Sequence, residues 1–319
     1  MPLGEFDLIR RYFTRNAENA TLGVGDDAAL LPITPGNELA VSTDMLVSGR
    51  HFFPDADPYY LGRKSLAVNL SDMAAMGAAP RWATLALALP EVNSDWLEAF
   101  ANGFFSMADE FGVELVGGDT TRGALNICVQ ILGEIRRGAA LRRDGAMIGD
   151  VVWISGELGS AALALAHLQG KVSLPAETFN ICAKSLNDPS PRVALGLDLQ
   201  DIAHSAIDIS DGLIGDLGHI LQRSNVAAKI RIDNIPYNSQ LKTYLEQPLG
   251  PQVLLAGGDD YELCFTVAPQ HTQAIRDIST RLQLQLTPVG EIIGGSGLIV
   301  LDQHDMPLDL NLNAFDHFS

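Results

Sequence analysis

Short apolar runs typical of buried strands alternate along this chain with apolar stripes of helical spacing. Trp82–Leu89 and Asn126–Leu132 have the length and composition of strands. The stripe between them ends at a glycine and consists of Trp96 or Leu97, Phe100, Phe104, Met107, Phe111 and then Gly112. A chain with this alternation buries its sheets under helices, so we predict a mixed α/β fold.

The same two patterns recur in the rest of the chain. Upstream, Glu38–Asp44 is a predicted strand, and a predicted helix carries Leu61, Leu66, Leu70, Met73 and Met76. Downstream, the predicted strands are 150–155, 206–209, 229–232, 262–267 and 297–301, and the predicted helices are 160–169, 213–223 and 272–282.

The length of 319 residues, of which 47% are apolar, suffices for two domains with separate cores. Between Arg136 and Gly149 the sequence becomes basic and contains glycine before a new strand begins. We place the domain boundary there, which gives domains 1–147 and 148–319.

Composition excludes several classes of partner. A net charge of −18 opposes binding to nucleic acid. The apolar runs are far shorter than the roughly 20 residues that span a bilayer, so no membrane partner is expected.

The first fifteen residues lack the features of a signal peptide, which predicts a cytoplasmic protein. Cys128, Cys182 and Cys264 are interpreted as reduced core residues.

Aspartates recur where we expect strands to end. They are Asp26 and Asp27 in GVGDDAA, Asp44 in AVSTD, Asp72 in NLSDMAAMG, Asp119 in LVGGDTTRG, Asp208 and Asp211 in IDISDGL, and Asp259 and Asp260 in AGGDDYEL. One acid at such a place is usually a surface residue or a helix cap. Because strand ends of an open sheet converge where α/β ligands bind, the whole series predicts a site.

Several carboxylates held together need cations to neutralise them. Carboxylate and hydroxyl oxygens suit Mg²⁺, which bridges one or two protein carboxylates to substrate phosphates. The absence of nearby His or Cys makes zinc a poor candidate. The glycine pairs 117–118 and 257–258 are expected to let the backbone approach a ligand closely.

Other phosphate and hydrolase signatures are missing. The sequence has no GxxxxGK[ST], protein-kinase, GxSxG or HExxH pattern. A nucleotide phosphate would then be neutralised by metal, with Arg122 or Arg143 available for the transferring group, although either Arg is equally well a solvated surface charge. His51 in SGRHFFP is either structural or functional.

Together these motifs resemble the thiamine-monophosphate kinase family from end to end. The resemblance is carried by GEFDLIRRYF, GVGDDAALL, VSTDMLVSGRHF, AVNLSDMAAMGAAP, GGDTTRG, AIDISDGLIGDLGHI, GGDDYELCF and the final FDHF. GDDAA, NLSDMAAMG and GGDTT also mark a wider superfamily, which includes aminoimidazole ribonucleotide synthetase, selenophosphate synthetase and a hydrogenase maturation factor.

The resemblance implies a two-domain fold like that of aminoimidazole ribonucleotide synthetase. Its N-terminal domain would form a β-barrel with a second subunit, so that a homodimer is expected, and its C-terminal α/β domain would close over the substrates. The implied reaction moves the ATP γ-phosphate onto thiamine monophosphate by direct in-line attack, which yields thiamine diphosphate, the end product of that biosynthesis.

The resemblance also implies roles for individual residues. Several Mg²⁺ ions would be held by Asp27, Ser42, Thr43, Asp44, Asp72, Asp119, Asp208 and Asp211. The carboxylates expected to carry catalysis are Asp27, Asp72, Asp119, Asp208 and Asp211. ATP would contact Gly118, Asp119, Arg143 and Ser210, and thiamine monophosphate would contact His51, Asp259 and Phe315.

Two positions depart from the family pattern. Asp259 stands where GGEDYEL of the family has Glu, so its contact with the substrate is expected to be longer or bridged by water. The C-terminal aromatic of the family falls between Leu312 and Phe315, and Phe315 is our choice. An anchoring role for Phe315 is an equal alternative.

Other enzymes of the superfamily and a non-catalytic protein are the alternatives. Selenophosphate synthetase and the hydrogenase factor need a reactive Cys near the N-terminus or at the C-terminus, but no Cys precedes Cys128 and the chain ends FDHFS. A ribonucleotide synthetase fits VSTDMLVSGRHF less well. A non-catalytic binding protein would hold metal or nucleotide without forming ADP.

Overall fold

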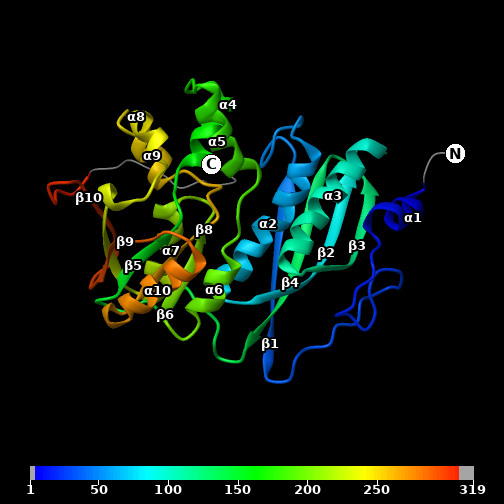
Figure 1. Cartoon of the computed structure of the whole chain (residues 1–319), viewed down its shortest axis with the longest axis horizontal. Helices are drawn as coiled ribbons and strands as arrows, with labels where there is room; N and C mark the ends of the chain where they lie inside the picture. The colour runs from blue at the N-terminus through cyan, green and yellow to red at the C-terminus, as the bar shows by residue number, and fades with distance from the viewer. Residues whose placement is uncertain (1–3, 309–319) are drawn as a thin grey trace. The chain divides into compact units, whose positions relative to one another are not determined.

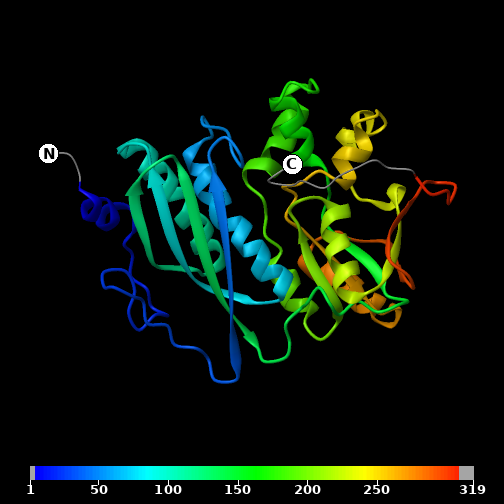
Figure 2. The same ribbon diagram turned by 180° about the vertical axis from the view of Figure 1, so that it is seen from behind.

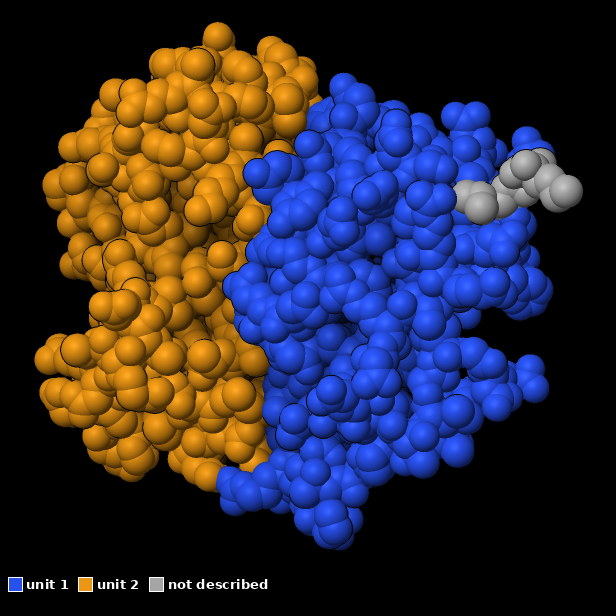
Figure 3. Space-filling model, turned by 45° about the vertical axis from the view of Figure 1, so that its right-hand side comes forward, with its two compact units in different colours: residues 1–73, 78–138 blue, residues 74–77, 139–319 orange. Residues whose placement is uncertain are grey.

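The computed structural model describes residues 4–308 and divides the chain into two compact units. Figure 3 shows unit 1, which comprises Met1–Met73 and Ala78–Gly138, in blue, and unit 2, which comprises Ala74–Gly77 and Ala139–Ser319, in orange. The domain boundary between residues 147 and 148 stays a prediction, and Phe315 lies outside the described residues.

Unit 1 contains a sheet of four strands in the order β1-β4-β2-β3. The strands are β1 (Asn37–Val47), β2 (Ala79–Leu89), β3 (Glu114–Arg122) and β4 (Asn126–Arg136). β4 pairs antiparallel with β1 and β2, and β2 pairs parallel with β3. The two ends of this sheet do not pair with each other, so one chain forms an open sheet and no barrel.

Two long helices of unit 1, α2 (Pro58–Met76) and α3 (Ser94–Phe111), cover one face of this sheet (Figures 1 and 2). The short α1 (Glu5–Leu8) and η1 (Ile9–Phe13) precede them. Most of both predicted stripes lies in the core, where Leu66, Leu70, Phe100 and Phe104 are fully buried, but Met76 at the end of the first stripe is 37% exposed. α3 ends at Gly112, whose left-handed backbone (φ 65°) suits glycine.

The opposite face of the same sheet carries exposed apolar side chains. In β1, the alternating residues Leu39, Val41 and Met45 are 42%, 52% and 54% exposed. Among the described residues of unit 1, no helix covers this face, whose strands lie toward the viewer in Figure 2. This outer face, defined by Leu39, Val41 and Met45, is therefore an apolar surface left open in the single chain.

Unit 2 contains a sheet of six strands in the order β10-β7-β9-β5-β8-β6. The strands are β5 (Val151–Ser155), β6 (Ala203–Ile209), β7 (Ala227–Arg231), β8 (Glu262–Val267), β9 (Leu286–Ile293) and β10 (Gly297–Leu301). Neighbouring strands are antiparallel except for the parallel pair β10 and β7.

Two apolar clusters stabilise unit 2. One joins the sheet to α7 (Leu213–Ser224), and the other packs α4 (Ser160–Leu168), α5 (Ala176–Asn187) and α9 (Gly250–Leu255) together. Figure 1 shows these last three helices and α8 (Lys242–Leu245) at one end of the sheet. The remaining helices are α6 (Val193–Leu199), η2 (Ile232–Asn234), η3 (Ser239–Leu241), η4 (Pro269–His271) and α10 (Thr272–Leu282).

No helix within residues 4–308 has both the length and the apolar character needed to cross a bilayer. The three cysteines are free, as predicted. Cys182 and Cys264 are buried, and burial raises the pKa of Cys182 to about 11. Cys128 is only half-buried, so its assignment to the core was wrong.

Candidate functional site

An oxygen-rich group lies between β1 and α2 in unit 1. Ser42 Oγ donates a hydrogen bond to a carboxylate oxygen of Asp72. The backbone N–H of Asp44 donates to Oδ1 of Asn69 at 3.3 Å. Because residues two apart on a strand share a face, the side chains of Ser42 and Asp44 both lie on the side of the sheet that faces α2. Ser42, Asp44 and Asp72 thus form what we call the unit 1 oxygen group.

The premise that the aspartates stand at strand ends is wrong for several of them. Asp72 lies inside helix α2, while Asp44 and Asp119 lie inside strands β1 and β3. The helical stripe that ends at Met76 already contained position 72, so the helix could have been inferred from the sequence.

Thr43 faces away from the unit 1 oxygen group. Strand alternation puts its side chain on the outer face, where Gln130 Nε2 lies 3.3 Å from Thr43 Oγ1. Within one chain, its hydroxyl is therefore not placed beside those of Ser42 and Asp44. A role of Thr43 as a metal ligand through its side chain has no support from this arrangement.

Asp119 belongs to a row of cross-strand partners whose side chains point to the outer face. Pairing aligns Asp119 with Ala86, Cys128 and Met45, whereas Asp44 is aligned with Val129 in the next row. Adjacent rows of a sheet point to opposite faces. The described chain thus does not bring Asp119 onto the side of the sheet that carries the unit 1 oxygen group.

The paired glycines serve packing between chain segments. A Cβ on Gly118, whose φ is 149°, would lie 1.9 Å from the carbonyl oxygen of Leu85 in β2. A Cβ on Gly258 would lie 2.3 Å from the carbonyl oxygen of Ser210. At these two positions the neighbouring backbone requires glycine, and the close approach to a ligand stays a prediction.

Asp27 and His51 lie in loops of unit 1. Asp27 is exposed, and its backbone N–H donates to Oδ1 of Asp26 at 2.9 Å. His51 accepts the backbone N–H of Val47 at Nδ1, at 2.9 Å. With Nδ1 acting as an acceptor, the proton of a neutral imidazole is on Nε2, which is a donor suited to a phosphate or carbonyl oxygen.

The second group of predicted residues lies in unit 2, where β6 turns into α7. Asp208 is buried in β6, and Ser210 and Asp211 follow it in the turn. Asp216 Oδ2 accepts the backbone N–H groups of three consecutive residues, Ser210, Asp211 and Gly212, each at 3.1 Å. Burial, together with the charges of Asp208 and Asp211, raises the pKa of Asp216 to about 7. Sequence reasoning missed Asp216, because an acid in the first turn of a helix is ordinary.

The GGDDYEL segment is fixed against this turn. The backbone N–H of Asp259 donates to the carbonyl oxygen of Ser210 at 2.9 Å, and that of Tyr261 donates to Ile209 at 2.8 Å. Asp259 and Tyr261 have positive φ angles of 67° and 50°, and the Tyr261 hydroxyl lies 3.2 Å from Asp259 Oδ1. A left-handed backbone conformation is energetically unfavourable for residues other than glycine, and residues in such conformations are found most often at functional sites.

The two following acids of GGDDYEL have structural partners. Both carboxylate oxygens of Asp260 lie 3.1 Å from the N–H of Gly159, and desolvation raises the pKa of Asp260 well above its usual value. Glu262, which is buried, accepts Arg192 Nε at 2.6 Å and Ser155 Oγ at 2.5 Å.

The two candidate arginines differ in their surroundings. Arg143 is exposed, and its carbonyl oxygen accepts Ser224 Oγ at 2.9 Å. Arg122 is exposed as well, and its Nε donates to the carbonyl oxygen of Pro90 at 3.3 Å. Neither guanidinium is buried by protein, so each can reach a ligand or remain solvated.

Among the predicted residues, one group in unit 1 consists of Ser42, Asp44 and Asp72, and Asp208, Ser210, Asp211 and Asp259 lie around one turn of unit 2. Within the described residues, no set of three or more His, Cys, Asp or Glu side chains is arranged as a complete metal cage. This donor set fits Mg²⁺, which keeps several waters and needs only one or two carboxylates beside substrate phosphates. Ser42, Asp44, Asp72 and Asp211, which are half-buried, would supply that kind of partial coordination.

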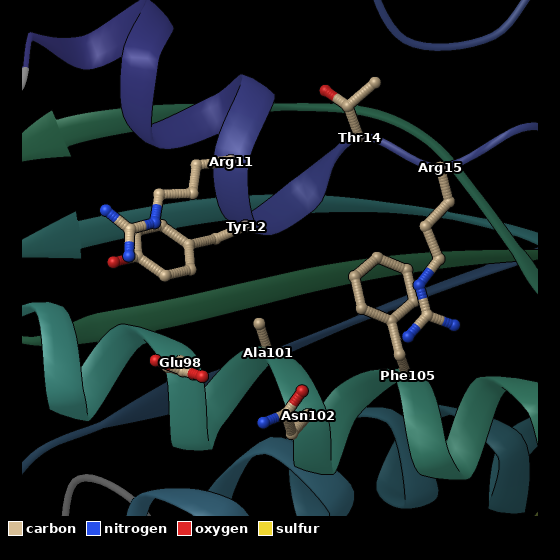
Figure 4. A pocket seen from close by; sticks show the side chains of 8 residues that line it. All are labelled: Arg11, Tyr12, Thr14, Arg15, Glu98, Ala101, Asn102 and Phe105. Carbon is tan, nitrogen blue, oxygen red and sulfur yellow. The ribbon is translucent and has the colours of Figure 1, made fainter.

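A separate pocket of about 240 Å³ lies between η1 and α3 (Figure 4). It is lined by Arg11, Tyr12, Thr14, Arg15, Glu98, Ala101, Asn102 and Phe105. The guanidinium of Arg15 lies 3.7 Å from the centre of the Phe105 ring and pairs with Asp109. None of the predicted site residues lines this pocket.

Comparison with known proteins identifies relatives along the full chain. Residues 25–135 match the N-terminal domain of AIR synthase related proteins, and residues 148–303 match their C-terminal domain. The thiamine-monophosphate kinase of Salmonella typhimurium is 42% identical over 324 residues, which cover 100% of this chain and 99% of that protein.

Solved structures agree with this relationship. A thiamine-monophosphate kinase from Stenotrophomonas maltophilia K279a is similar with a TM-score of 0.84 and 47% identity, over 89% of this chain and 91% of that one. A structure of AaThiL complexed with AMPPCP and TMP is similar with a TM-score of 0.78 and 30% identity, over 89% of both chains. The chain therefore belongs to the thiamine-monophosphate kinase family of phosphotransferases.

Proposed function

We propose that this protein transfers the γ-phosphate of ATP to thiamine monophosphate and so forms thiamine diphosphate and ADP. The observation that carries the proposal is the end-to-end similarity to a thiamine-monophosphate kinase at 42% identity. The related AaThiL structure, complexed with AMPPCP and TMP, supports the same pair of substrates. Because ATP and the phosphorylated vitamin are metabolites of the cytoplasm, we place the reaction there.

Magnesium ions are the proposed cofactors. In unit 1, Asp27, Ser42, Asp44 and Asp72 would provide oxygen ligands, and in unit 2, Asp208 and Asp211 would do so. Asp119, which lies on the opposite side of the sheet from the unit 1 oxygen group, and the backbone of Thr43 are proposed as further Mg²⁺ ligands. When bound, Mg²⁺ neutralises the negative charge that accumulates when two phosphates are brought together.

The residues themselves bind and orient the two substrates. Gly118, Arg143 and Ser210 are proposed to contact ATP, and His51 would donate from Nε2 to the phosphate of thiamine monophosphate. The acceptor is already a phosphate oxygen, so no strong base and no phosphoenzyme are needed for in-line attack. Positioning and charge neutralisation then supply most of the catalysis.

Asp259 is the proposed contact with the vitamin. Its carboxylate is one methylene shorter than the Glu expected in the family, and it lies beside the Tyr261 hydroxyl at 3.2 Å. We propose that a water molecule bridges Asp259 to the substrate. Phe315 is retained as the proposed C-terminal aromatic contact.

Product analysis tests the reaction directly. ATP and thiamine monophosphate with Mg²⁺ are expected to give equal amounts of ADP and thiamine diphosphate, and excess EDTA is expected to abolish both. Unphosphorylated thiamine should give no product, because it lacks the attacking phosphate oxygen. Chromatography of both nucleotides and thiamine species provides the measurement. Absence of thiamine diphosphate with active, folded protein and Mg²⁺ would reject the assignment.

The outer face of unit 1 is proposed to join a second copy of this chain in a barrel. It exposes Leu39, Val41 and Met45 on a strand that forms one edge of the open sheet. An apolar strand face at a sheet edge is unfavourable in water unless it is covered. A second copy offers the same apolar face, which meets the self-complementarity of a two-fold interface.

Charge on the outer face is expected to break the proposed dimer. The double variant Val41→Glu with Met45→Glu should sediment as a monomer at micromolar concentration, because four carboxylates would be buried in each interface. Ile148→Glu, at a side chain of unit 2 that is 68% exposed, is the matched control and should stay dimeric. If the unaltered protein sediments only as a monomer at this concentration, the interface does not exist.

A further inference from the structure

The carboxylate of Asp216 organises the turn between β6 and α7. A single oxygen, Oδ2, accepts three successive backbone N–H groups, those of Ser210, Asp211 and Gly212. The side chain is only 3% exposed, although it is placed in the first turn of α7. This acid is therefore committed to the turn that carries the proposed ligands.

Successive N–H groups that converge on one point form a binding site for an anion. In this turn the anion is the protein's own carboxylate. Those three N–H groups are consequently not available to a nucleotide phosphate. If Ser210 contacts ATP, it must do so through its hydroxyl.

The turn is constrained on its other side as well. The carbonyl oxygen of Ser210 accepts the N–H of Asp259 at 2.9 Å. Gly212 has a φ of 110°, and a Cβ there would lie 2.7 Å from the carbonyl carbon of Ala256. The backbone from Ser210 to Gly212 is therefore held between α7 and the GGDDYEL segment.

We propose that Asp216 is a positioning residue, which holds the Ser210–Gly212 turn so that Asp208 and Asp211 present a preformed site for a divalent cation. The proposal rests on the proposed function for the identity of these two ligands. It assigns Asp216 the task of holding the turn through Oδ2, which accepts three backbone N–H groups, and does not make Asp216 a metal ligand. Without this acceptor, three N–H groups would lose their partner, and the turn would lose its conformation.

The proposal makes the acceptor oxygen, and not the charge, the functional feature. Asn has the shape of Asp and keeps one carbonyl oxygen that can accept the three N–H groups. Leu has a similar volume and no acceptor. Asp216→Asn and Asp216→Leu therefore separate the two explanations.

Binding of Mn²⁺, followed by electron paramagnetic resonance, provides a test that needs neither ATP nor thiamine monophosphate. Asp211→Asn first identifies the Mn²⁺ sites that depend on unit 2. At those sites, Asp216→Asn is expected to bind within about threefold of the unaltered protein, and Asp216→Leu at least about tenfold more weakly. Leu217→Ala, which removes a fully buried side chain of the same helix, is the matched control. It should lose thermal stability and keep its Mn²⁺ affinity.

Each outcome is decisive. Equal Mn²⁺ affinity in folded Asp216→Leu and unaltered protein would overturn the positioning role, as would equal losses in the Asn and Leu variants. If the Leu variant does not fold, amide hydrogen exchange on the unaltered, metal-free protein replaces it. Residues 210–212 should then exchange slowly, and exchange at the rate of an unfolded peptide would reject the proposal. Failure of the kinase assay leaves this comparison intact, since only Mn²⁺ binding is measured.

Discussion

Asp72→Asn is expected to lower kcat by about a hundredfold or more and to leave the fold unchanged. Asn keeps an oxygen that accepts the Ser42 hydroxyl, so the local hydrogen bond is preserved. What is lost is a negative charge next to the proposed Mg²⁺, and metal-assisted stabilisation of a phosphoryl group is worth several kcal/mol. Since each 1.4 kcal/mol or so is a factor of ten, the loss spans orders of magnitude. Steady-state kinetics at saturating ATP and Mg²⁺ give the value.

A matched variant in the same unit separates this effect from surface charge. Asp109 pairs with Arg15 at 3.1 Å on the surface, and its side chain is 69% exposed. Asp109→Asn removes the same charge and should leave kcat unchanged, because exposed ion pairs contribute little. Near-normal turnover by Asp72→Asn, with circular dichroism that matches the unaltered protein, would mean that the proposed site is misplaced.

Glu262→Ala is expected to destabilise unit 2 by about 3–5 kcal/mol, which is the typical effect of removing one partner of a buried ion pair. Glu262 is buried, and it accepts both the Arg192 guanidinium and the Ser155 hydroxyl. Without the Glu262 carboxylate, the largely buried guanidinium of Arg192 loses its ionic partner, and the buried hydroxyl of Ser155 loses its acceptor. Native-state hydrogen exchange of β5 and β8, read by mass spectrometry, measures the change without assuming that both units unfold together.

Two further variants test the physical reason for this effect. Glu291→Ala removes an exposed acid of the same sheet, whose partner Lys229 is 3.7 Å away, and should cost less than about 1 kcal/mol. Replacing the pair together, as Arg192→Met with Glu262→Leu, should recover most of the lost stability, because no unpaired charge is then left. A double variant as unstable as Glu262→Ala would show that packing, and not charge, governs this position.

Elements with a complete local pattern were predicted correctly. β8, β10 and α10 were predicted with the bounds that the structure shows, and α7 differs by one residue. In each case an unbroken apolar run or a single helical stripe lies between clear turn residues. Local sequence preference and tertiary packing agree in these segments, so the sequence alone was sufficient.

Elements with a mixed local pattern were missed. β3 contains Gly117 and Gly118 and was not given as a strand over this range, but Gly118 is required there because β2 approaches too closely for a side chain. α6 contains Gly196, where a Cβ would lie 2.1 Å from the carbonyl oxygen of Ala74. In both segments glycine satisfies a contact with residues distant in the sequence, which no local pattern reveals.

The candidate site was predictable in chemistry but not in arrangement. The family motifs identified the acidic residues of the site. The side of the sheet on which the side chains of β1 and Asp119 lie depends on how the strands pair, which the motifs do not give. Asp216 could not be singled out, because its role is defined by three N–H groups in a turn whose shape the sequence does not state. The metal ligands and substrate contacts stay predictions.

The position of β5 in its sheet has a consequence for biosynthesis. β5 lies between β8 and β9, which follow it by more than a hundred residues. The sheet of unit 1 is complete once β4 has been synthesised, but the centre of the unit 2 sheet cannot form until β9 has emerged from the ribosome. Strand pairing over long sequence separations is slow, and during that time the apolar strands of unit 2 remain unpaired and exposed to solvent. We therefore expect unit 1 to fold during translation, and the nascent unit 2 to be the part that depends on chaperones.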